Sequence, residues 1–333
     1  MSWDILGHEW AVDLLSEHVA QGRVRHAYLF TGPQGLGRRT LALSLAQALN
    51  CPKPLAPGQP CQKCSTCRRI RQMTHPDLSV VQAEQVGGTL KVEQVRELQR
   101  SLALSPYEAA YRVAVLLRFE EAHTSAANAL LKTLEEPNPQ VVLVLTANSP
   151  EDLLPTIVSR CEGLRLRPLT IQQVAQGLQA RQQHTQENAN LLAHLSDGRP
   201  GYAFQLQAQP ELLELRQTWL EDLYRLISAN RVERFAYAQV LTKDKEKEAV
   251  RSVLYVWLSF WRDVLLKAGG ASASVTNIDW IEQINSLAAS LNLASAQKVV
   301  ASLEHTLGLM DGNINTRLAI EVLLLDLPRA HTL

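Results

Sequence analysis

Residues 27–40 have the sequence AYLFTGPQGLGRRT, in which an apolar strand runs into a glycine-rich turn and then into a helix. Further apolar runs follow at 78–81, 113–117 and 141–145, and stretches with apolar residues at helical spacing separate them. Strands that alternate with helices of this length predict a parallel sheet with helices on both faces. We therefore expect an α/β domain at the start of the chain.

The turn contains Gly32, Gly35 and Gly37, and the spacing Gly32-x4-Gly37 is that of a P-loop, whose backbone N–H groups bind phosphate. A hydrolysing loop has Lys after the last glycine to reach the β- and γ-phosphates, and then Ser or Thr to hold Mg²⁺. Arg38 and Arg39 stand at these two positions. Because a guanidinium does not replace a compact ammonium and cannot ligate a cation, we predict a degenerate loop. We expect no ATP binding by this chain; a chance turn and an intact ATPase loop are the alternatives.

A second test of ATPase chemistry is the pair of acids that follows the corresponding strand in ATPases. One acid binds Mg²⁺ through water, and the other polarises the attacking water. Here the strand at 113–117 continues into Arg118, and Glu120 and Glu121 arrive about three residues late. Counting back the usual interval from the downstream helix places the two acid positions at Leu117 and Arg118. If the loop before that helix is shorter by three residues, the two acid positions fall at Glu120 and Glu121 instead. Both alignments stay open, and a third interpretation has the two acids facing solvent at a helix start.

Four of the five cysteines lie in one short window with the spacing C-x9-C-x2-C-x2-C, namely Cys51, Cys61, Cys64 and Cys67. Four thiolates complete the tetrahedral shell of Zn²⁺ and leave no open position, which is typical of a structural zinc site. The cluster also indicates a reducing compartment rather than a disulfide framework. We predict structural Zn²⁺ as the metal of this chain.

The composition bounds the partners and the number of domains. Thirty-three basic side chains balance thirty-three acidic ones, which argues against nucleic-acid binding through overall charge. No run approaches the roughly 18 apolar residues of a membrane span, so we expect no membrane contact and a cytoplasmic location. Strand-like runs stop after the first unit, which predicts an α/β domain at 1–168 with a zinc module at about 51–67, a small helical domain at 169–207 and an all-helical domain at 208–333.

The segment AANALLKTLEEP at 126–137 closely resembles the signature of bacterial clamp-loader subunits, which belong to the AAA+ superfamily. The segment TIVSRC at 156–161 contains their Ser-Arg-Cys motif, and NINTRLAIE at 313–321 resembles their C-terminal helical pattern. The lost loop chemistry makes the chain more similar to the delta-prime type of the DNA polymerase III clamp loader than to the ATP-hydrolysing gamma/tau type. At 198–201 the chain has GRPG, where the hydrolysing relatives carry Gly-Ser-x-Arg with a phosphate-sensing Arg.

The resemblance implies an AAA+ domain, a helical lid and an all-helical collar through which related subunits form a ring. It also implies that Arg160, in the Ser-Arg-Cys motif, points into the ATP site of the next subunit as an arginine finger; the other interpretation is a local salt bridge. The implied function is a non-hydrolysing stator of the clamp loader. Its implied partners are the gamma/tau and delta subunits and, through the complex, the sliding clamp and primed DNA.

Two other functions stay open. One is a divergent gamma-type ATPase that uses Arg38 in place of Lys and Glu120 as its acid. The other is a zinc-bearing interaction module on an old ATPase fold, outside replication. A collar surface and an ordinary monomer core are both compatible with the tryptophans of the C-terminal region, Trp219, Trp257, Trp261 and Trp280.

Overall fold

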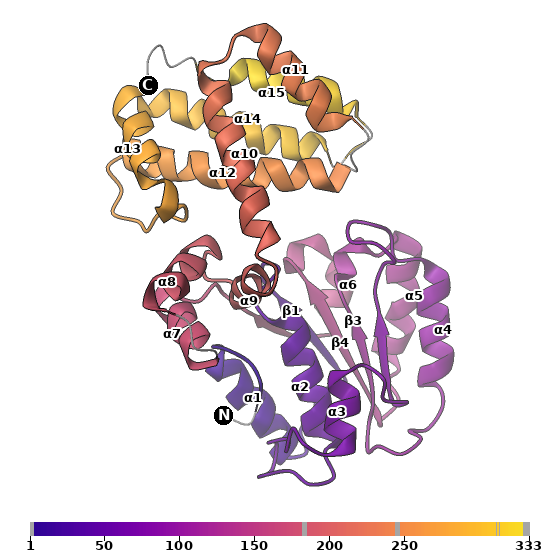
Figure 1. The fold of residues 1–333 in the computed structure, drawn as a ribbon. Coiled ribbons are helices and arrows are strands. Elements are labelled where there is room, and N and C mark those ends of the chain that lie inside the picture. Colours follow the sequence, from indigo (N-terminus) through magenta and orange to yellow (C-terminus); the bar gives the residue numbers. More distant parts are fainter. Residues whose placement is uncertain (1–2, 182–184, 244–246, 311, 313, 329–333) are drawn as a thin grey trace. The chain divides into compact units, whose positions relative to one another are not determined.

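The computed structural model describes residues 3–181, 185–243, 247–310, 312 and 314–328. The chain divides into two compact units (Figure 1). The first comprises Met1–Gly177 with Gly198–Tyr202, and the second comprises Leu178–Asp197 with Ala203–Leu333. Because the segment 169–207 is divided between the two units, the three-domain organisation stays a prediction.

The first unit is built on a sheet of five parallel strands in the order β2-β3-β4-β1-β5. The strands are β1 Ala27–Thr31, β2 Leu78–Val81, β3 Arg112–Leu116, β4 Val141–Ala147 and β5 Glu162–Arg165. The parallel sheet expected from the sequence is therefore confirmed. The edge strand β5 was not predicted, because its four residues include Glu162, Gly163 and Arg165 and carry little apolar pattern.

Helices cover both faces of this sheet. Successive side chains of each strand point to opposite faces, so both faces present apolar side chains that a layer of helices can bury. Tyr28 and Phe30 pack with α1 and α2 on one face, and Ala27 and Leu29 pack with α4 and α5 on the other. The helical elements up to the boundary between the units are α1 Glu9–Ala20, α2 Arg38–Asn50, α3 Ser65–Arg71, α4 Val92–Leu102, η1 Phe119–Glu121, α5 Thr124–Glu135, η2 Pro150–Asp152, α6 Pro155–Val158 and α7 Ile171–Arg181.

The second unit contains helices and no strand in the part of it that the structure describes. Its core is centred on Trp257 and Trp261, whose side chains are completely buried, and Trp280 is also buried. Three of the four tryptophans therefore fill the core of this unit and offer no collar surface. The remaining helical elements of the chain are α8 Gln186–Leu195, α9 Pro200–Ala208, α10 Glu211–Ser228, α11 Arg231–Thr242, α12 Lys247–Ala268, η3 Ile278–Trp280, α13 Ile281–Ser290, α14 Leu293–Leu309 and α15 Thr316–Asp326.

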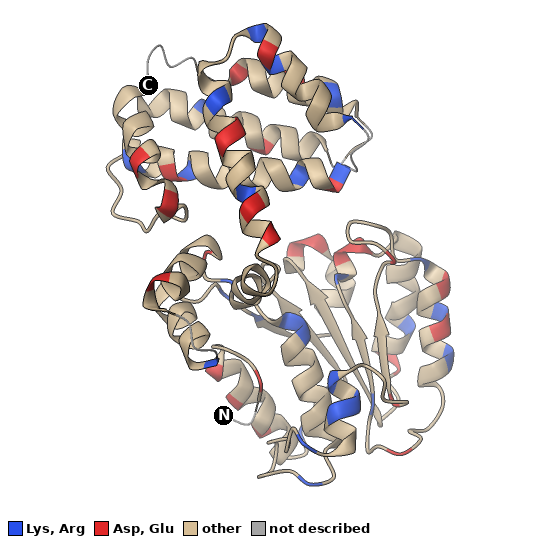
Figure 2. Ribbon diagram, in the orientation of Figure 1, with Lys and Arg blue, Asp and Glu red and all other residues tan. Residues whose placement is uncertain are grey.

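Acidic and basic residues are interspersed on most helices of both units (Figure 2). The short helix α3 is an exception, because it carries Arg68, Arg69 and Arg71. Arg69 forms an ion pair with Glu108, and Arg71 donates a hydrogen bond to Gln62, so two of the three are engaged within the unit. None of the described helices is long and apolar enough to span a membrane.

Candidate functional site

The glycine-rich loop connects β1 to α2 at the carboxyl edge of the sheet. Gly32, Gly35 and Gly37 have φ values of 136°, 90° and 93°, in the region that favours glycine. A Cβ atom on Gly32 would lie 2.4 Å from the carbonyl oxygen of Leu166, so this backbone approach requires glycine. The predicted phosphate-loop conformation between strand and helix is present, although its side-chain chemistry has changed.

Arg38, the first residue of α2, points inward and is only 7% exposed. Its Nη2 donates a hydrogen bond of 3.1 Å to Oδ1 of Asn148, which directly follows β4. Its Nη1 is buried without a partner among the described residues. Burial lowers the pKa of Arg38, and the negative charge of Glu120 opposes that change. The guanidinium is therefore held inside its own chain by groups at the carboxyl edge of the sheet.

Glu120 and Glu121 belong to the single-turn helix η1, and each is partly buried with one carboxylate oxygen shielded from solvent, so the solvent interpretation is wrong. Oε1 of Glu121 accepts hydrogen bonds from Nε of Arg118 at 2.8 Å and from the N–H of Gly87 at 2.9 Å. Burial raises the pKa of Glu120, and the positive charge of Arg38 opposes the rise. Glu120 is thus the acid that the fold brings to the phosphate loop, while Glu121 is engaged by Arg118.

The start of α9 covers another side of the loop. The N–H of Gly201 donates a 2.7 Å hydrogen bond to the carbonyl oxygen of Gly35. A Cβ atom on Gly201 would lie 2.8 Å from that oxygen, so a phosphate-sensing Arg could not occupy this position without moving the backbone. The guanidinium of Arg199 lies over the ring of Tyr202, 4.8 Å from its centroid. The backbone contact brings the GRPG segment directly onto the degenerate loop.

Arg160 follows α6 and has a side chain that is 35% exposed. Its Nη2 bonds Oε1 of Glu135, the last residue of α5, at 2.8 Å. Its Nη1 donates to the carbonyl oxygen of Thr156 at 2.9 Å. The local salt bridge weighed as an alternative is therefore present in the isolated chain. The neighbouring thiol of Cys161 is half-buried, and burial raises its pKa to about 12, which suits a packing role rather than a nucleophile.

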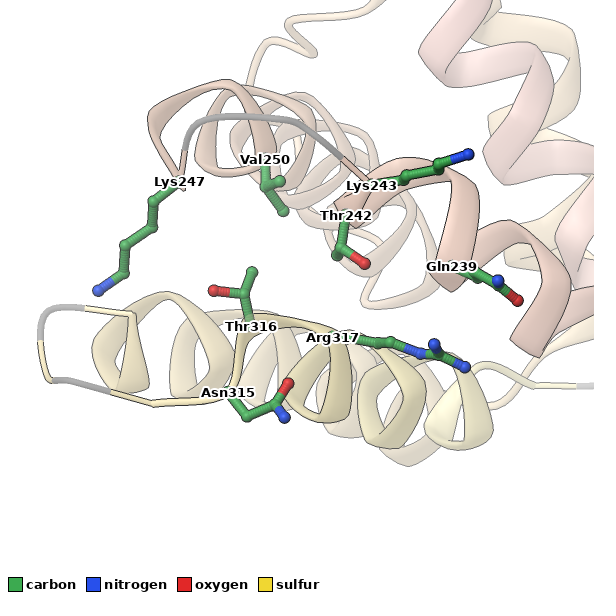
Figure 3. A pocket seen from close by; sticks show the side chains of 8 residues that line it. All are labelled: Gln239, Thr242, Lys243, Lys247, Val250, Asn315, Thr316 and Arg317. Carbon is green, nitrogen blue, oxygen red and sulfur yellow. The ribbon is translucent and has the colours of Figure 1, made fainter.

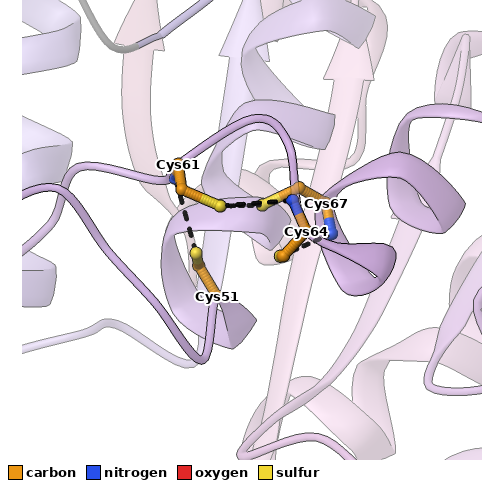
Figure 4. Close-up of side chains that lie close together, drawn as sticks. All are labelled: Cys51, Cys61, Cys64 and Cys67. Carbon is orange, nitrogen blue, oxygen red and sulfur yellow. Dashed lines mark hydrogen bonds between the residues drawn. The ribbon is translucent and has the colours of Figure 1, made fainter.

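The four cysteines converge before and along α3 (Figure 4). Their Sγ atoms all lie within 4.8 Å of one another, and no disulfide joins them. Backbone N–H groups donate to sulfur: Cys61 to Cys51, Cys64 to Cys61 and Cys67 to Cys64, each at 3.4 Å. Donors from Lys63 and Cys64 lower the pKa of the Cys61 thiol to about 6. This donor set fits a tetrahedral metal with Zn–S bonds of roughly 2.3 Å, and the predicted ligands are brought together.

His75 lies outside this cluster. Its Nδ1 accepts a 3.1 Å hydrogen bond from the N–H of Asp77, and its Nε2 lies 3.2 Å from a carboxylate oxygen of Glu108. Asp77 in turn accepts hydrogen bonds from three consecutive backbone N–H groups, those of Tyr107, Glu108 and Ala109. These contacts give His75 a structural role in holding the segment before β3.

Sequence comparisons place this arrangement in a family. Residues 7–170 match the family described as DNA polymerase III, delta subunit, and residues 210–329 match the one described as DNA polymerase III, delta subunit, C terminal. The DNA polymerase III subunit delta' of Bacillus subtilis is 30% identical over 316 residues, which cover 94% of this chain and 94% of that protein. The chain belongs to the delta-prime family of DNA polymerase III subunits.

Other relatives connect the delta-prime family to its paralogues. The delta' subunit of Pseudomonas aeruginosa is 39% identical over 154 residues, 46% of this chain and 47% of that protein. The tau subunit of Escherichia coli is 34% identical over 176 residues, 53% of this chain and 27% of that protein. A gamma subunit-related protein of Thermotoga maritima has the same fold, with a TM-score of 0.53, 20% identity and coverage of 95% and 97% of the two chains. The predicted fold class is confirmed, and a module outside replication is no longer supported.

The delta-prime chain also has a pocket that the sequence did not predict (Figure 3). It lies in the second unit between the end of α11, the start of α12 and the start of α15, with a volume of about 510 Å³. Lys247 donates to the carbonyl of Gly312, and Arg317 pairs with Glu321. The segment 313–321 reaches this pocket, although Asn313 lies outside the described residues. The lining residues are Gln239, Thr242, Lys243, Lys247, Val250, Asn315, Thr316 and Arg317.

Proposed function

We propose that this delta-prime chain is a non-hydrolysing stator subunit of the DNA polymerase III clamp loader. The observation that carries the proposal is the placement of Arg38. A working loop needs a mobile ammonium that reaches the β- and γ-phosphates, whereas this guanidinium is buried and bonded to Asn148. Arg39 provides no hydroxyl for Mg²⁺, and Gly201 packs against Gly35. These features together support a loop that has a structural role and is not an ATP-binding site.

The chemical contribution that remains is Arg160, which we assign as an arginine finger in trans. In the neighbouring site, water attacks the γ-phosphorus, the bond to the ADP oxygen breaks, and negative charge develops on the transferred phosphoryl group. A guanidinium directed at those oxygens neutralises the charge, an effect of about 10³–10⁵ in rate for arginine fingers in general. The partial exposure of Arg160 and its surface partner Glu135 leave it able to make such a contact.

The partners that we propose are the tau/gamma-type ATPase subunits and a delta subunit, with the sliding clamp and primed DNA engaged through the complex in the cytoplasm. One feature of the second unit supports packing against another subunit. Leu318, Val322 and Leu325 are spaced along α15 at positions that share a helix face, and they are 58%, 54% and 46% exposed. An apolar stripe of this kind is typical of a helical packing surface and favours a collar role for residues 208–333.

The cysteine cluster would hold Zn²⁺ as a structural element. When bound, zinc would supply four metal–sulfur bonds that fix the loop between α2 and α3, and the four thiolates would leave no coordination position for a substrate. Gln47 of α2 donates a 2.7 Å hydrogen bond to the carbonyl oxygen of Cys67, which ties the module to the sheet-covering helix. The proposed role is to stabilise the first unit and not to take part in hydrolysis.

Reconstitution tests the proposal. The chain is combined with tau/gamma-type and delta subunits of the same organism, and DNA-stimulated ATP hydrolysis is compared for wild type, Arg160→Ala and Arg167→Ala. Arg167 is an exposed arginine of the same unit and serves as the matched control. We expect Arg160→Ala to remove hydrolysis at one site, Arg167→Ala to retain the wild-type rate, and the isolated chain to show no turnover. Equal rates for both variants would refute the finger assignment.

A divergent ATPase is the second candidate, because Glu120 lies near Arg38 at the loop as a catalytic acid would. Equilibrium binding of Mg²⁺ and ATP to the isolated chain, with turnover that Glu120→Gln abolishes, would favour it. Under the stator proposal neither binding nor turnover is expected, and Glu120→Gln leaves the ATPase rate of the reconstituted complex unchanged. The two functions are therefore separated by measurements on the single chain.

A further inference from the structure

The guanidinium of Arg160 contacts three acceptors of its own chain. Nη2 bonds Oε1 of Glu135 at 2.8 Å, and Nη1 bonds the carbonyl oxygen of Thr156 at 2.9 Å, with the hydroxyl of Ser159 at 3.4 Å. The side chains of Arg160 and Glu135 are 35% and 51% exposed. The carboxylate is the only charged group among these three acceptors, so it dominates the electrostatic attraction on the guanidinium.

We propose that Glu135 is a positioning residue that competes with the neighbouring subunit's γ-phosphate for Arg160. The proposal rests on the function proposed above, in which Arg160 acts in trans. When the neighbouring site lacks a γ-phosphate, Glu135 retains the guanidinium. When ATP is bound there, the phosphate takes the place of the carboxylate while Thr156 continues to hold the other side of the guanidinium.

The exchange is favoured by the strengths of the two interactions. Solvent weakens an ion pair between partly exposed side chains, and such pairs contribute little. A guanidinium–phosphate contact carries more negative charge, is often bidentate, and is made where a subunit interface excludes water. The phosphate therefore wins when it is present, and Glu135 wins when it is absent. Glu135 would thus make the finger selective for a triphosphate over a diphosphate in the next subunit.

Glu135→Gln removes the charge and keeps an oxygen that can accept from Nη2. The variant should weaken the competitor and also remove the repulsion between a carboxylate and the incoming phosphate. Both effects point in one direction, a lower KM for ATP at the neighbouring site. The exposure of the pair limits the decrease to about twofold to fivefold. Because Thr156 still orients the guanidinium, kcat should stay unchanged.

The matched control is Glu136→Gln, which removes one charge from the next position along the chain. Glu136 is likewise exposed, and no ion pair joins it to Arg160 among the described residues. The complex reconstituted with tau/gamma-type and delta subunits is assayed over a range of ATP concentrations. The quantity fitted is the component of hydrolysis that disappears in Arg160→Ala, so KM and kcat refer to the site that receives the finger. Glu135→Gln is also measured in the Arg160→Ala background.

We expect Glu135→Gln to lower this KM and Glu136→Gln to leave it unchanged. Added to Arg160→Ala, Glu135→Gln should leave the residual hydrolysis and its dependence on ATP unchanged. A loss of hydrolysis in Arg160→Ala together with equal KM values for both glutamine variants would overturn the role of Glu135 and leave the finger assignment standing. A shift in the ATP dependence of the residual hydrolysis when Glu135→Gln is added to Arg160→Ala would also overturn it, since the charge would then act without Arg160. Unchanged hydrolysis in Arg160→Ala would refute the finger and this inference together.

Discussion

The guanidinium of Arg234 should control the stability of the helical second unit. It lies in the first turns of α11, is 2% exposed, and its five N–H groups donate to five backbone carbonyl oxygens at 2.7–3.2 Å. Each carbonyl lies at or just beyond the carboxyl end of a helix, where helices leave these groups without partners. The acceptors are Leu226 and Ile227 of α10, Leu324 of α15, and Leu327 and Pro328 after it.

The expected loss follows from counting donors. Arg234→Lys retains the positive charge but has three N–H donors, so at least two of the five carbonyls lose their partner. A buried group left without a hydrogen bond costs about 1–3 kcal/mol, so two such carbonyls give a loss of about 2–6 kcal/mol for the lysine variant. Arg234→Met removes all five bonds and the charge at two helix ends, and its loss should exceed about 5 kcal/mol. Such a loss is a large part of the stability of an ordinary domain.

Urea unfolding of the full chain, followed by tryptophan fluorescence, measures the effect. Four of the six tryptophans belong to the second unit, so the signal reports mainly on its unfolding. The control is Arg225→Lys, because Arg225 is 67% exposed and its pair with Asp222 should change stability by less than about 0.5 kcal/mol. A loss below about 1 kcal/mol for Arg234→Lys, at an unchanged slope of free energy against urea, would show that the carbonyl contacts do not carry this stability.

Three further outcomes are expected. Burial alone would raise the pKa of Asp77, but hydrogen bonds from backbone N–H groups and from Arg112 bring it below its usual 3.8. The stabilisation by the ionised carboxylate is therefore present above about pH 4 and is lost as the pH falls through the lower pKa of the folded state. Asp77→Asn should accordingly flatten the acid side of a curve of unfolding free energy against pH. Cys64→Ser should release bound zinc, measured by metal analysis, and should lower the Tm of the first unit without changing the helical one. Val322→Asp on the exposed face of α15 should weaken assembly with partner subunits, measured by size-exclusion chromatography, while leaving the circular dichroism of the isolated chain unchanged.

Features that depend on backbone conformation or on local spacing could be predicted from the sequence. The glycines of the phosphate loop are required where φ is positive and where the backbone passes close to Leu166, so their spacing alone indicated the loop. The ligands Cys61, Cys64 and Cys67 are three residues apart along one short segment, so local geometry nearly determines their convergence. Cys51 joins them because α2 ends beside α3.

The partners of the functional side chains could not be predicted in the same way. Arg38 bonds Asn148, 110 residues later, only because β4 pairs with β1 and the two strands end side by side. Glu135 meets Arg160 because α5 ends near α6, across 25 residues that include a whole strand. The solvent interpretation of Glu120 failed for a related reason: a single-turn helix after β3 directs this acid toward the loop. Such pairings follow from strand order and element length, which no local pattern encodes.

Arg38 and Arg160 differ in the free-energy cost of leaving their places. This difference favours a chain that donates an arginine to a neighbouring ATP site over one that hydrolyses ATP itself. Moving Arg38 would break its charge-assisted hydrogen bond to Asn148, worth about 1.5–3 kcal/mol, and would leave the partly buried carboxylate of Glu120 without a nearby positive charge. Releasing Arg160 from Glu135 costs no more than about 1 kcal/mol, because both side chains are partly exposed. One charge-assisted contact with phosphate, about 1.5–3 kcal/mol, exceeds the second cost, whereas for Arg38 it would only replace the hydrogen bond to Asn148 and would leave Glu120 without a nearby positive charge. A phosphate offered to this chain should therefore recruit Arg160 from the surface and leave Arg38 bound within the loop.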